Sequence, residues 1–319
     1  MGTRKPFPYK RAVVTGGAGF IGSHLVDALL ALGVDTISID NYTSGTEANL
    51  AHAHTYANFQ AVCCDVRNYR RLWQLLDGVD VVFHNAAAKK VASTEDPNLD
   101  LDVNARGTLN LLRLSRQRGV RKFVHASTGS VYGHPVTKPQ DETHPTVPTT
   151  LYGVSKLAGE QYARVFHSLY GLDTTVLRYF HVYGPRQEND AGAGVAWVFV
   201  QRALQGKGPV IHGDGSQERT FTYVGDVVAA NLLVAVTEGT AGQVYNCSSG
   251  IGTTVGELAA KVLQMTGRQD LEATYEDWRL GEVLEFDVDN SKLRDTGFEF
   301  RTSLHEGLAL TQRYYAERL

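Results

Sequence analysis

The chain of 319 residues has little cysteine, no long uncharged apolar run and no excess of positive charge. Its three cysteines, two of them adjacent in the apolar run FQAVCCDV, are too few and of the wrong parity for a disulfide framework. No stretch approaches the roughly 18 apolar residues of a membrane span, and the N-terminus lacks the apolar region of a signal peptide. We therefore expect a cytoplasmic protein that does not enter the membrane.

The charge balance excludes further classes of function. The formal net charge is −3, so the chain has no basic footprint for nucleic acid. The cysteines fit buried strand positions better than metal ligands, and we expect no metal. A hydrophobic content of 43% with 20% charged residues is typical of an ordinary globular protein.

The first half of the sequence alternates between two kinds of segment. Short apolar runs rich in β-branched residues are followed by longer segments with helical spacing, which predicts βαβ units around a parallel sheet. The fold class expected is therefore α/β, a Rossmann-type doubly wound parallel sheet with helices on both faces. The expected strands are 11–15, 35–40, 59–64, 80–84, 121–127 and 173–180, and the expected helices are 20–32, 68–77, 98–118 and 152–170.

The pattern changes after about residue 180, where segments become shorter and connections richer in glycine. We expect residues 1–180 to form the cofactor-binding domain and residues 181–319 to form mainly a smaller, mixed lobe that binds the substrate. Parts of 220–250 are expected to return to the first domain. Further helices are expected near 195–206, 225–237, 254–266 and 303–318.

A glycine-rich turn, TGGAGFIGSH at 15–24, joins the first expected strand to the first helix. Glycines at 16, 19 and 22 allow the backbone to turn tightly and to approach a diphosphate at a helix N-terminus, where N–H groups and the helix dipole favour an anion. Phe20 and Ile21 begin the helix and are included in the expected cofactor site. The strand before the turn and the helix after it make a dinucleotide site the better interpretation than a structural turn.

Acidic residues follow the next two strands. Asp40 lies 18 residues after Gly22, the position from which a carboxylate binds the adenosine ribose hydroxyls and repels a 2′-phosphate. This predicts NAD rather than NADP, with Asn41 beside it. Asp65, followed by Val66, is expected either to reach the adenine amino group or to cap the strand end, at even odds.

These motifs occur in an order that resembles a known family. With HNAAA at 84–88, DVNARGTLNLL at 102–112, STGSVYG at 127–133 and YGVSK at 152–156, the chain resembles the extended short-chain dehydrogenase/reductases, and among them the NAD-dependent nucleotide-sugar epimerase/dehydratase family. The resemblance spans nearly the whole chain, through LRYFHVYGPRQ, GDGSQERTFTYVGDV and WRLGEV. It implies that Ala86, Ala87 and Asn104 also belong to the NAD site.

The resemblance also gives a role to the pair in YGVSK, which would otherwise read as a half-buried tyrosine beside a solvated lysine. Tyr152 and Lys156, four residues apart, lie on one helix face and can reach the same point. Tyr152 would exchange the proton of a sugar hydroxyl, while Lys156 would hold the nicotinamide ribose and lower the pKa of the phenol. Thr128 would hydrogen-bond the reacting hydroxyl, with Ser127 as the alternative.

The segment after Thr128 favours one reaction of the family. Dehydratases that resemble this chain carry acids there, and related decarboxylases carry a glutamate, whereas this chain has Gly129 and Ser130. We therefore expect a 4-epimerase that oxidises C4 of a nucleotide sugar and returns the hydride to the other face. A dehydratase, decarboxylase or 4-keto-sugar reductase remains the alternative, and a non-catalytic NAD-binding protein is less favoured.

Several side chains are expected near the substrate, a UDP-sugar. Arg219 and Arg279 match the arginines of the family that bind the diphosphate, and His181 replaces the usual asparagine. Arg186 is expected either to bind a C6 carboxylate or to form a structural ion pair. Lys89 is expected near the sugar or in solvent. UDP-glucose/galactose and UDP-glucuronate/galacturonate both stay open.

Two long helices are expected to make a homodimer. The segments 98–118 and 152–170 have apolar residues on more than one face, and in the family the corresponding pair forms a four-helix interface. The alternative is two helices that pack only on their own sheet.

Overall fold

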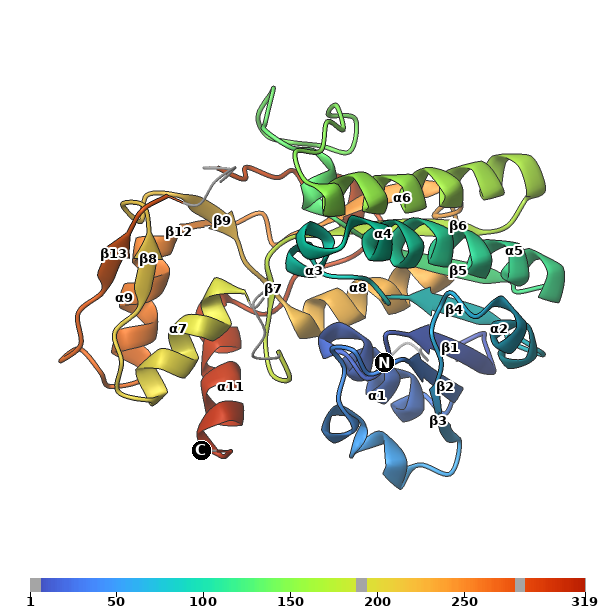
Figure 1. Ribbon diagram of the computed structural model, residues 1–319, viewed down its shortest axis with the longest axis horizontal. Coiled ribbons are helices and arrows are strands. Elements are labelled where there is room, and N and C mark those ends of the chain that lie inside the picture. The colour runs from blue at the N-terminus through green and yellow to red at the C-terminus, as the bar shows by residue number, and fades with distance from the viewer. Residues whose placement is uncertain (1–6, 188–193, 279–284, 319) are drawn as a thin grey trace.

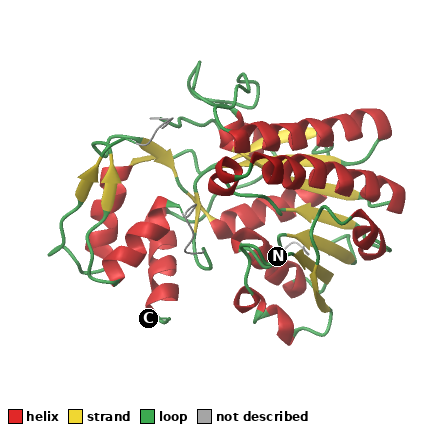
Figure 2. Cartoon of the chain, in the orientation of Figure 1, coloured by secondary structure: helices red, strands yellow, loops and turns green. Residues whose placement is uncertain are grey.

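The computed structural model describes residues 7–187, 194–278 and 285–318. Figure 1 shows a larger body, which carries the N-terminus and the main sheet, beside a smaller lobe that ends with the C-terminus. Figure 2 shows helices on both faces of the sheet in the larger body, and short strands with helices in the smaller lobe. The expected α/β class is confirmed.

Within the described residues, seven parallel strands form the central sheet in the order β11-β6-β5-β4-β1-β2-β3. The order reverses between β1 and β4, which makes a crevice at the carboxyl ends of these strands, the usual ligand position in an open α/β sheet. The strands are β1 (Arg11–Thr15), β2 (Asp35–Asp40), β3 (Phe59–Cys63), β4 (Val81–His84), β5 (Lys122–Thr128), β6 (Thr174–Tyr179) and β11 (Gln243–Cys247).

Helices cover both faces of this sheet because its strands are apolar on both sides. On one face, α1 (Phe20–Ala31) and α8 (Val224–Val236) bury residues such as Leu25 and Val227. On the other, α2 (Tyr69–Leu75), α5 (Thr108–Arg118) and α6 (Leu151–Tyr170) bury residues such as Leu111 and Phe166. Short 3-10 turns, η1 (Glu47–Leu50), η2 (Ala53–Thr55) and η4 (Gly129–Val131), lie in the connections.

The segment expected as one helix over 98–118 is more divided. It consists of α4 (Pro97–Asp100), a π-helical turn η3 (Leu101–Gly107) and α5, and it is preceded by α3 (Lys90–Glu95). Asn104 lies inside the π-turn, where its side chain hydrogen-bonds the backbone of Ala88. π-turns are rare and concentrate at functional sites, so this segment is a candidate part of a functional site.

The chain crosses between the two bodies more than once. After β6 it enters the smaller lobe, and α8 and β11 then return to the larger body, where β11 forms the edge of the sheet beside β6. The last segments, α10 (Ser291–Arg294) and α11 (Leu304–Ala316), again lie one on each side. Strand β11 was not among the expected strands, although 220–250 was expected to contribute here.

The smaller lobe has its own core. Phe199 of α7 (Val195–Leu204), Leu258 of α9 (Val255–Met265) and Leu308 of α11 pack together. Three two-stranded sheets complete this lobe and its junction with the larger body, and they pair β7 (Val182–Tyr183) with β10 (Thr222–Tyr223), β9 (Glu218–Thr220) with β12 (Gly252–Thr254), and β8 (Val210–His212) with β13 (Thr274–Glu276).

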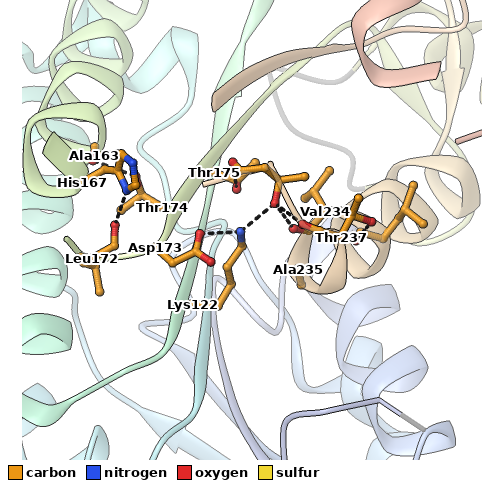
Figure 3. A network of polar contacts seen from close by, with 12 residues as sticks. Lys122, Ala163, His167, Leu172, Asp173, Thr174, Thr175, Val234, Ala235 and Thr237 are labelled. Atoms are coloured by element: carbon orange, nitrogen blue, oxygen red, sulfur yellow. Dashed lines mark hydrogen bonds and ion pairs between the residues drawn. The ribbon is translucent and has the colours of Figure 1, made fainter. Parts of the chain in front are cut away.

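At the amino end of β5, a buried lysine hydrogen-bonds the segments that precede β6 and β11. Lys122 is 1% exposed, and its Nζ donates to Asp173 Oδ1 at 2.7 Å and to Thr240 Oγ1 at 2.9 Å. Figure 3 shows how the neighbouring Thr175 and the end of α8 belong to the same polar network. This network lies at the end of the sheet away from the crevice.

Over the ranges that the structure describes, no helix has both the length and the apolar character of a membrane span. In the same ranges, His, Cys, Asp and Glu side chains do not gather in groups of three or more that could hold a metal ion.

Candidate active site

A cavity of about 530 Å³ opens at the carboxyl ends of the central strands. That volume is within the range of small-molecule and cofactor sites. Its walls come from the turn after β1, the ends of β2, β3, β4 and β5, and the start of α6. Most of the expected cofactor residues line it: Gly16, Gly19, Phe20, Ile21, Gly22, Asp40, Asn41, Asp65, Val66, Ala86, Ala87, Tyr152 and Lys156.

The glycine turn at the mouth of α1 has the geometry that a diphosphate requires. Gly16 has φ +67°, and a Cβ there would lie 2.8 Å from the backbone nitrogen of Ala86. A Cβ on Gly22 would lie 2.0 Å from the carbonyl oxygen of Gly16. Larger residues at either position would therefore displace this turn, which leads into α1, and the N-terminus of a helix favours an anion.

Asp40 ends β2 beside this turn. Its Oδ2 accepts from the backbone N–H of Ala18 at 3.0 Å and its Oδ1 from that of Tyr42 at 2.8 Å. Burial raises the pKa of this carboxyl, while these backbone hydrogen bonds lower it. The carboxylate is thus held rigidly at the cavity wall, as a ligand for ribose hydroxyls must be.

Asp65 lines the cavity but already has strong partners. Arg67 donates from Nε and Nη2 to the two carboxylate oxygens at 2.9 and 2.8 Å, and Asn41 Nδ2 donates at 2.9 Å. The hydrogen bonds from Arg67 lower the pKa of Asp65 to about 2. Asp65 therefore organises the strand end, which was the alternative to adenine binding, and its reach to an adenine stays a prediction.

The catalytic candidates meet at the inner end of the cavity. Tyr152 lies in the first turn of α6, which begins at a side-chain cap from Thr150 to the N–H of Gly153. Its phenol lies close enough to Thr128, at the end of β5, for that hydroxyl to lower the pKa of the phenol, and Lys156 lies one turn further along α6, 2% exposed. A hydroxyl, a phenol and an ammonium group thus converge from two elements.

The pKa values correct one expectation. We expected Lys156 to lower the pKa of Tyr152, but burial of the phenol raises it to about 12, with Asp100 adding to the rise and the Thr128 hydrogen bond opposing it. Burial also lowers the pKa of Lys156 to about 8, against the charges of Asp100 and Glu160. Burial is the largest cause of the shift in both groups.

Asn104, expected at the cofactor, lies outside the cavity lining and supports α6 instead. Its Oδ1 accepts from the N–H of Ala88, and its Nδ2 donates to Asp100 and to Ser155 Oγ. Asp100 Oδ1 also accepts from Ser155 and Ser93 at 2.9 and 2.6 Å. This buried cluster fixes the first turn of α6, and with it Tyr152, against the π-turn.

The comparison with known proteins identifies the family. The model of the NAD dependent epimerase/dehydratase family matches residues 12–248. The chain belongs to this family. NAD is the cofactor by which the family is described, and the glycine turn, Asp40 and the cavity of this structure fit it.

Relatives within the family include 4-epimerases. The putative UDP-glucose 4-epimerase of Methanocaldococcus jannaschii is 39% identical over 93% of this chain and 95% of its own. The UDP-glucose 4-epimerase of Mycolicibacterium smegmatis is 37% identical over 97% and 99%. The solved UDP-glucose 4-epimerase of Thermotoga maritima, bound to UDP-glucose, has a TM-score of 0.91 at 38% identity and covers 97% of this chain and 99% of its own.

Other reactions of the family occur among the matches. They include a UDP-N-acetyl-alpha-D-glucosaminuronate decarboxylase of Bacillus cytotoxicus, which is 34% identical over 81% of this chain and 80% of its own. Family membership therefore establishes an enzyme scaffold of the epimerase/dehydratase type but leaves the choice of reaction to the residues of the site.

The expected substrate residues are placed unevenly. Lys89 lines the cavity. His181 and Arg219 lie outside its lining and both contact Phe286, at 4.9 Å between ring centroids and at 5.3 Å from the guanidinium to the ring. His181, just before β7, and Arg219, in β9, therefore lie where the larger body meets the smaller lobe. Arg279 lies outside the described residues.

Arg186 lies outside the cavity lining. Its Nη2 donates to Asp27 of α1 at 2.6 Å, and both side chains are largely buried. The backbone of Arg186 also has φ +65°, which is unusual for a residue other than glycine. The ion pair is the alternative that was expected for Arg186, and its binding of a carboxylate stays a prediction.

Three functional candidates escaped the sequence analysis. Asp100 is buried below Tyr152, Tyr179 lines the cavity, and Glu160 accepts from Ser127 Oγ at 3.1 Å. Both expected hydroxyls donate within the protein, Ser127 to Glu160 and Thr128 to Ser130 Oγ, and Ser127 is the one of the two that lines the cavity. Glu160 could have been found because it follows Lys156 by four residues on the same helix face.

Proposed function

We propose that the protein is an NAD-dependent nucleotide-sugar 4-epimerase that inverts C4 of a UDP-hexose or UDP-hexuronic acid through a transient 4-keto sugar. The observation that carries the proposal is that Tyr152, Lys156 and Ser127 line one cavity, with Thr128 next to Ser127 at the end of β5. A proton acceptor, a hydroxyl that orients the substrate and a cation are the groups that oxidation of a secondary alcohol needs.

The roles follow from the positions. Thr128 would align the C4 hydroxyl, and Tyr152 would take its proton and later return it to the C4 oxygen. Lys156 binds the nicotinamide ribose and supplies positive charge. When bound, oxidised NAD would accept the hydride of C4 and give it back to the opposite face of that carbon, and its positive charge would favour the phenolate form that burial disfavours.

The packing after Thr128 favours epimerisation over dehydration. A Cβ on Gly129 would lie 2.4 Å from the ring of Phe180, which is 1% exposed. An acidic side chain at 129 therefore does not fit while that ring stays in place. At the next position, the Ser130 hydroxyl accepts a hydrogen bond from Thr128 Oγ1 at 3.3 Å and bears no carboxyl proton. Elimination of water needs an acid/base group that these positions do not provide.

The sugar is proposed as a neutral hexose first. Arg186, the residue that favoured a hexuronic acid, is paired with Asp27. UDP-glucose is also what the Thermotoga maritima relative binds, at 38% identity. A uronic acid remains the second substrate to test, because a UDP-glucuronic acid 4-epimerase of Bacillus cereus has a TM-score of 0.90 at 29% identity, covering 97% of this chain and 100% of its own.

Product analysis by NMR tests the function. The purified protein is incubated with NAD and, separately, with UDP-glucose, UDP-glucuronate and UDP-N-acetylglucosamine, without a reductant. We expect the C4-inverted partner of UDP-glucose and no net change in nicotinamide absorbance. A keto-deoxy sugar, a pentose or unchanged starting material in every tube would contradict the proposal.

We also propose that α6 forms a homodimer interface with the neighbouring segment 98–118. Its outward face carries a stripe of exposed apolar residues at helical spacing. Single exposed apolar residues are normal on a protein surface, but a row of them indicates an interface. The stripe consists of Leu151, Val154, Tyr162, Val165 and Leu169, between 38% and 67% exposed. Sedimentation should give twice the chain mass, and Val165→Glu should give the mass of one chain; a monomeric wild-type protein at micromolar concentration would contradict the dimer.

A further inference from the structure

The proposed mechanism does not use a buried ion pair, Glu160 with Arg178, that contacts the strand end next to the catalytic candidates. Glu160 is fully buried on α6, and Arg178 of β6 is 3% exposed. Arg178 engages both carboxylate oxygens of Glu160, with Nε to Oε2 at 3.0 Å and Nη2 to Oε1. Burying two charges costs more free energy than burying apolar groups of the same size, so such a pair needs a reason beyond stability.

Glu160 connects this ion pair to the segments that carry the catalytic candidates. Tyr152, Lys156 and Glu160 follow one another at intervals of four residues and lie along one face of α6. Glu160 Oε2 also accepts from Ser127 Oγ at 3.1 Å, and Ser127 precedes Thr128 in β5. One carboxylate therefore joins the helix that carries Tyr152 to the strand end that carries its partner Thr128.

The other side of the network reaches the segments that lead into the smaller lobe. Arg178 Nη1 donates to the hydroxyl of Tyr132 at 2.7 Å, and this hydroxyl donates to Asn246 Oδ1 at 2.7 Å. Asn246 Nδ2 in turn donates to the carbonyl oxygens of Gln140 and Asp289 at 3.1 and 2.9 Å. Asp289 lies three residues after Phe286, which contacts His181 and Arg219.

We propose that Glu160 is a positioning residue, which holds the Ser127–Thr128 strand end in register with Tyr152 and Lys156. The inference rests on the proposed function. A fork between carboxylate and guanidinium is directional and fixes two elements more narrowly than apolar packing does. Small displacements of catalytic groups reduce the rate steeply, by about 10²-fold for about 1 Å.

The test compares Glu160→Gln with a matched control at the other end of the sheet. In the holoenzyme, Glu160→Gln should lower kcat by about 10²-fold with KM almost unchanged, because binding groups stay in place while the reacting geometry is lost. The control, Asp173→Asn, also takes the anion from a buried cation, Lys122, but far from the site. It should lower stability and leave kcat unchanged.

A second variant separates positioning from folding. Glu160→Gln combined with Arg178→Met removes both charges, so thermal stability should recover, since buried ion pairs are often replaced by neutral groups without loss. The kcat should stay low, because the amide oxygen at position 160 can still accept from Ser127 but no longer has the Arg178 fork that fixes its orientation. Recovery of kcat together with stability, or equal losses of kcat in Glu160→Gln and Asp173→Asn, would overturn the proposal.

A readout independent of turnover distinguishes this proposal from the proposed function. The N–H of Ser130 donates to Thr128 Oγ1 at 3.2 Å and so reports the order of the strand end. Hydrogen exchange of peptides covering 127–132 should be faster in Glu160→Gln and unchanged in Asp173→Asn. If the wild type converts no sugar nucleotide, the function fails, and unchanged exchange in Glu160→Gln would by itself sink the positioning role.

Discussion

Lys122 and Lys156 are both buried cations, one at each end of the central sheet, and their surroundings differ. Lys122 donates to Asp173 and to Thr240, so its charge has near partners (Figure 3). In the part of the chain that the structure describes, Lys156 feels the charges of Asp100 and Glu160 but has no hydrogen bond from its ammonium group.

The difference separates a structural cation from a functional one. Burial lowers the pKa of both lysines, so burial alone does not tell them apart. Unused hydrogen-bonding capacity does, because a group whose donors are free can bind a ligand without first breaking a protein contact. By this criterion the carboxyl end of the sheet is the site and the amino end is the scaffold.

Of the changes that test this difference between the two ends of the sheet, substitution of Tyr152 should have the largest effect on kcat. Tyr152→Phe should lower kcat by at least about 10³-fold, because the phenol alone carries the proton. Binding of NAD and of the sugar nucleotide, measured by calorimetry, should be retained. Tyr275→Phe, on β13 of the smaller lobe and 63% exposed, is the control and should have the wild-type rate; near wild-type turnover of Tyr152→Phe would refute the mechanism.

Acid should act on the carboxyl end through two buried imidazoles. Burial, with the charge of Lys156, lowers the pKa of His84 to about 3 and that of His125 well below its ordinary value. The unfolded chain therefore binds more protons below about pH 6.5, and the free energy of unfolding should fall there by about 1.4 kcal/mol per pH unit for each imidazole. The raised pKa values of Asp40 and Glu142 oppose this fall at lower pH.

Denaturant titration at several pH values measures that dependence. His125→Leu should reduce the slope between pH 6.5 and 5 by one proton, because neither ring nitrogen of His125 has a hydrogen-bond partner within the described ranges. The same slope in His125→Leu and in the wild type would show that His125 titrates normally.

At the amino end, Asp173→Asn probes stability alone. Removing the anion from Lys122 should lower the free energy of unfolding by about 2 kcal/mol, reduced from a fully buried value because Asp173 is 39% exposed. Chemical denaturation measures this loss. A parallel fall in kcat would break the distinction between the two ends of the sheet.

The smallest effect is expected for cofactor choice. Asp40→Ala should weaken NAD binding by about tenfold and reduce its preference over NADP, because the carboxylate that binds ribose hydroxyls and repels a 2′-phosphate is lost. Affinities for both cofactors, measured by fluorescence titration, provide the test. Unchanged selectivity would remove Asp40 from the ribose site.

The main sheet and the cofactor turn were predictable because their signals are local. The glycine turn, Asp40 and the first six strands depend on periodicity and on residues close in sequence. Strand β11 was not, because the strand before it in the sheet, β6, lies more than sixty residues earlier in the chain. The π-turn was missed for a similar reason, since the bond of Asn104 to Ala88 joins separate elements.

Side-chain orientation was the least predictable property. Nothing in the run YGPRQ tells that Arg186 turns toward Asp27 on a helix some 160 positions away. The pKa of Tyr152 depends on burial, which only the assembled fold defines. Residues whose role depends on tertiary partners therefore need the structure, whereas those whose role depends on backbone shape do not.

The contact between Gly129 and Phe180 also bears on how this scaffold diverges in evolution. A side chain gained at 129 meets the ring of Phe180, so the substitution is unfavourable while that ring is present. Loss of the ring alone would leave a cavity in the core, with a cost of several kcal/mol, about 3–5 for Phe→Ala. The two positions are therefore epistatic: a lineage that moves from this packing toward an acid at 129 has to change 180 first or both together, through an intermediate of reduced fitness.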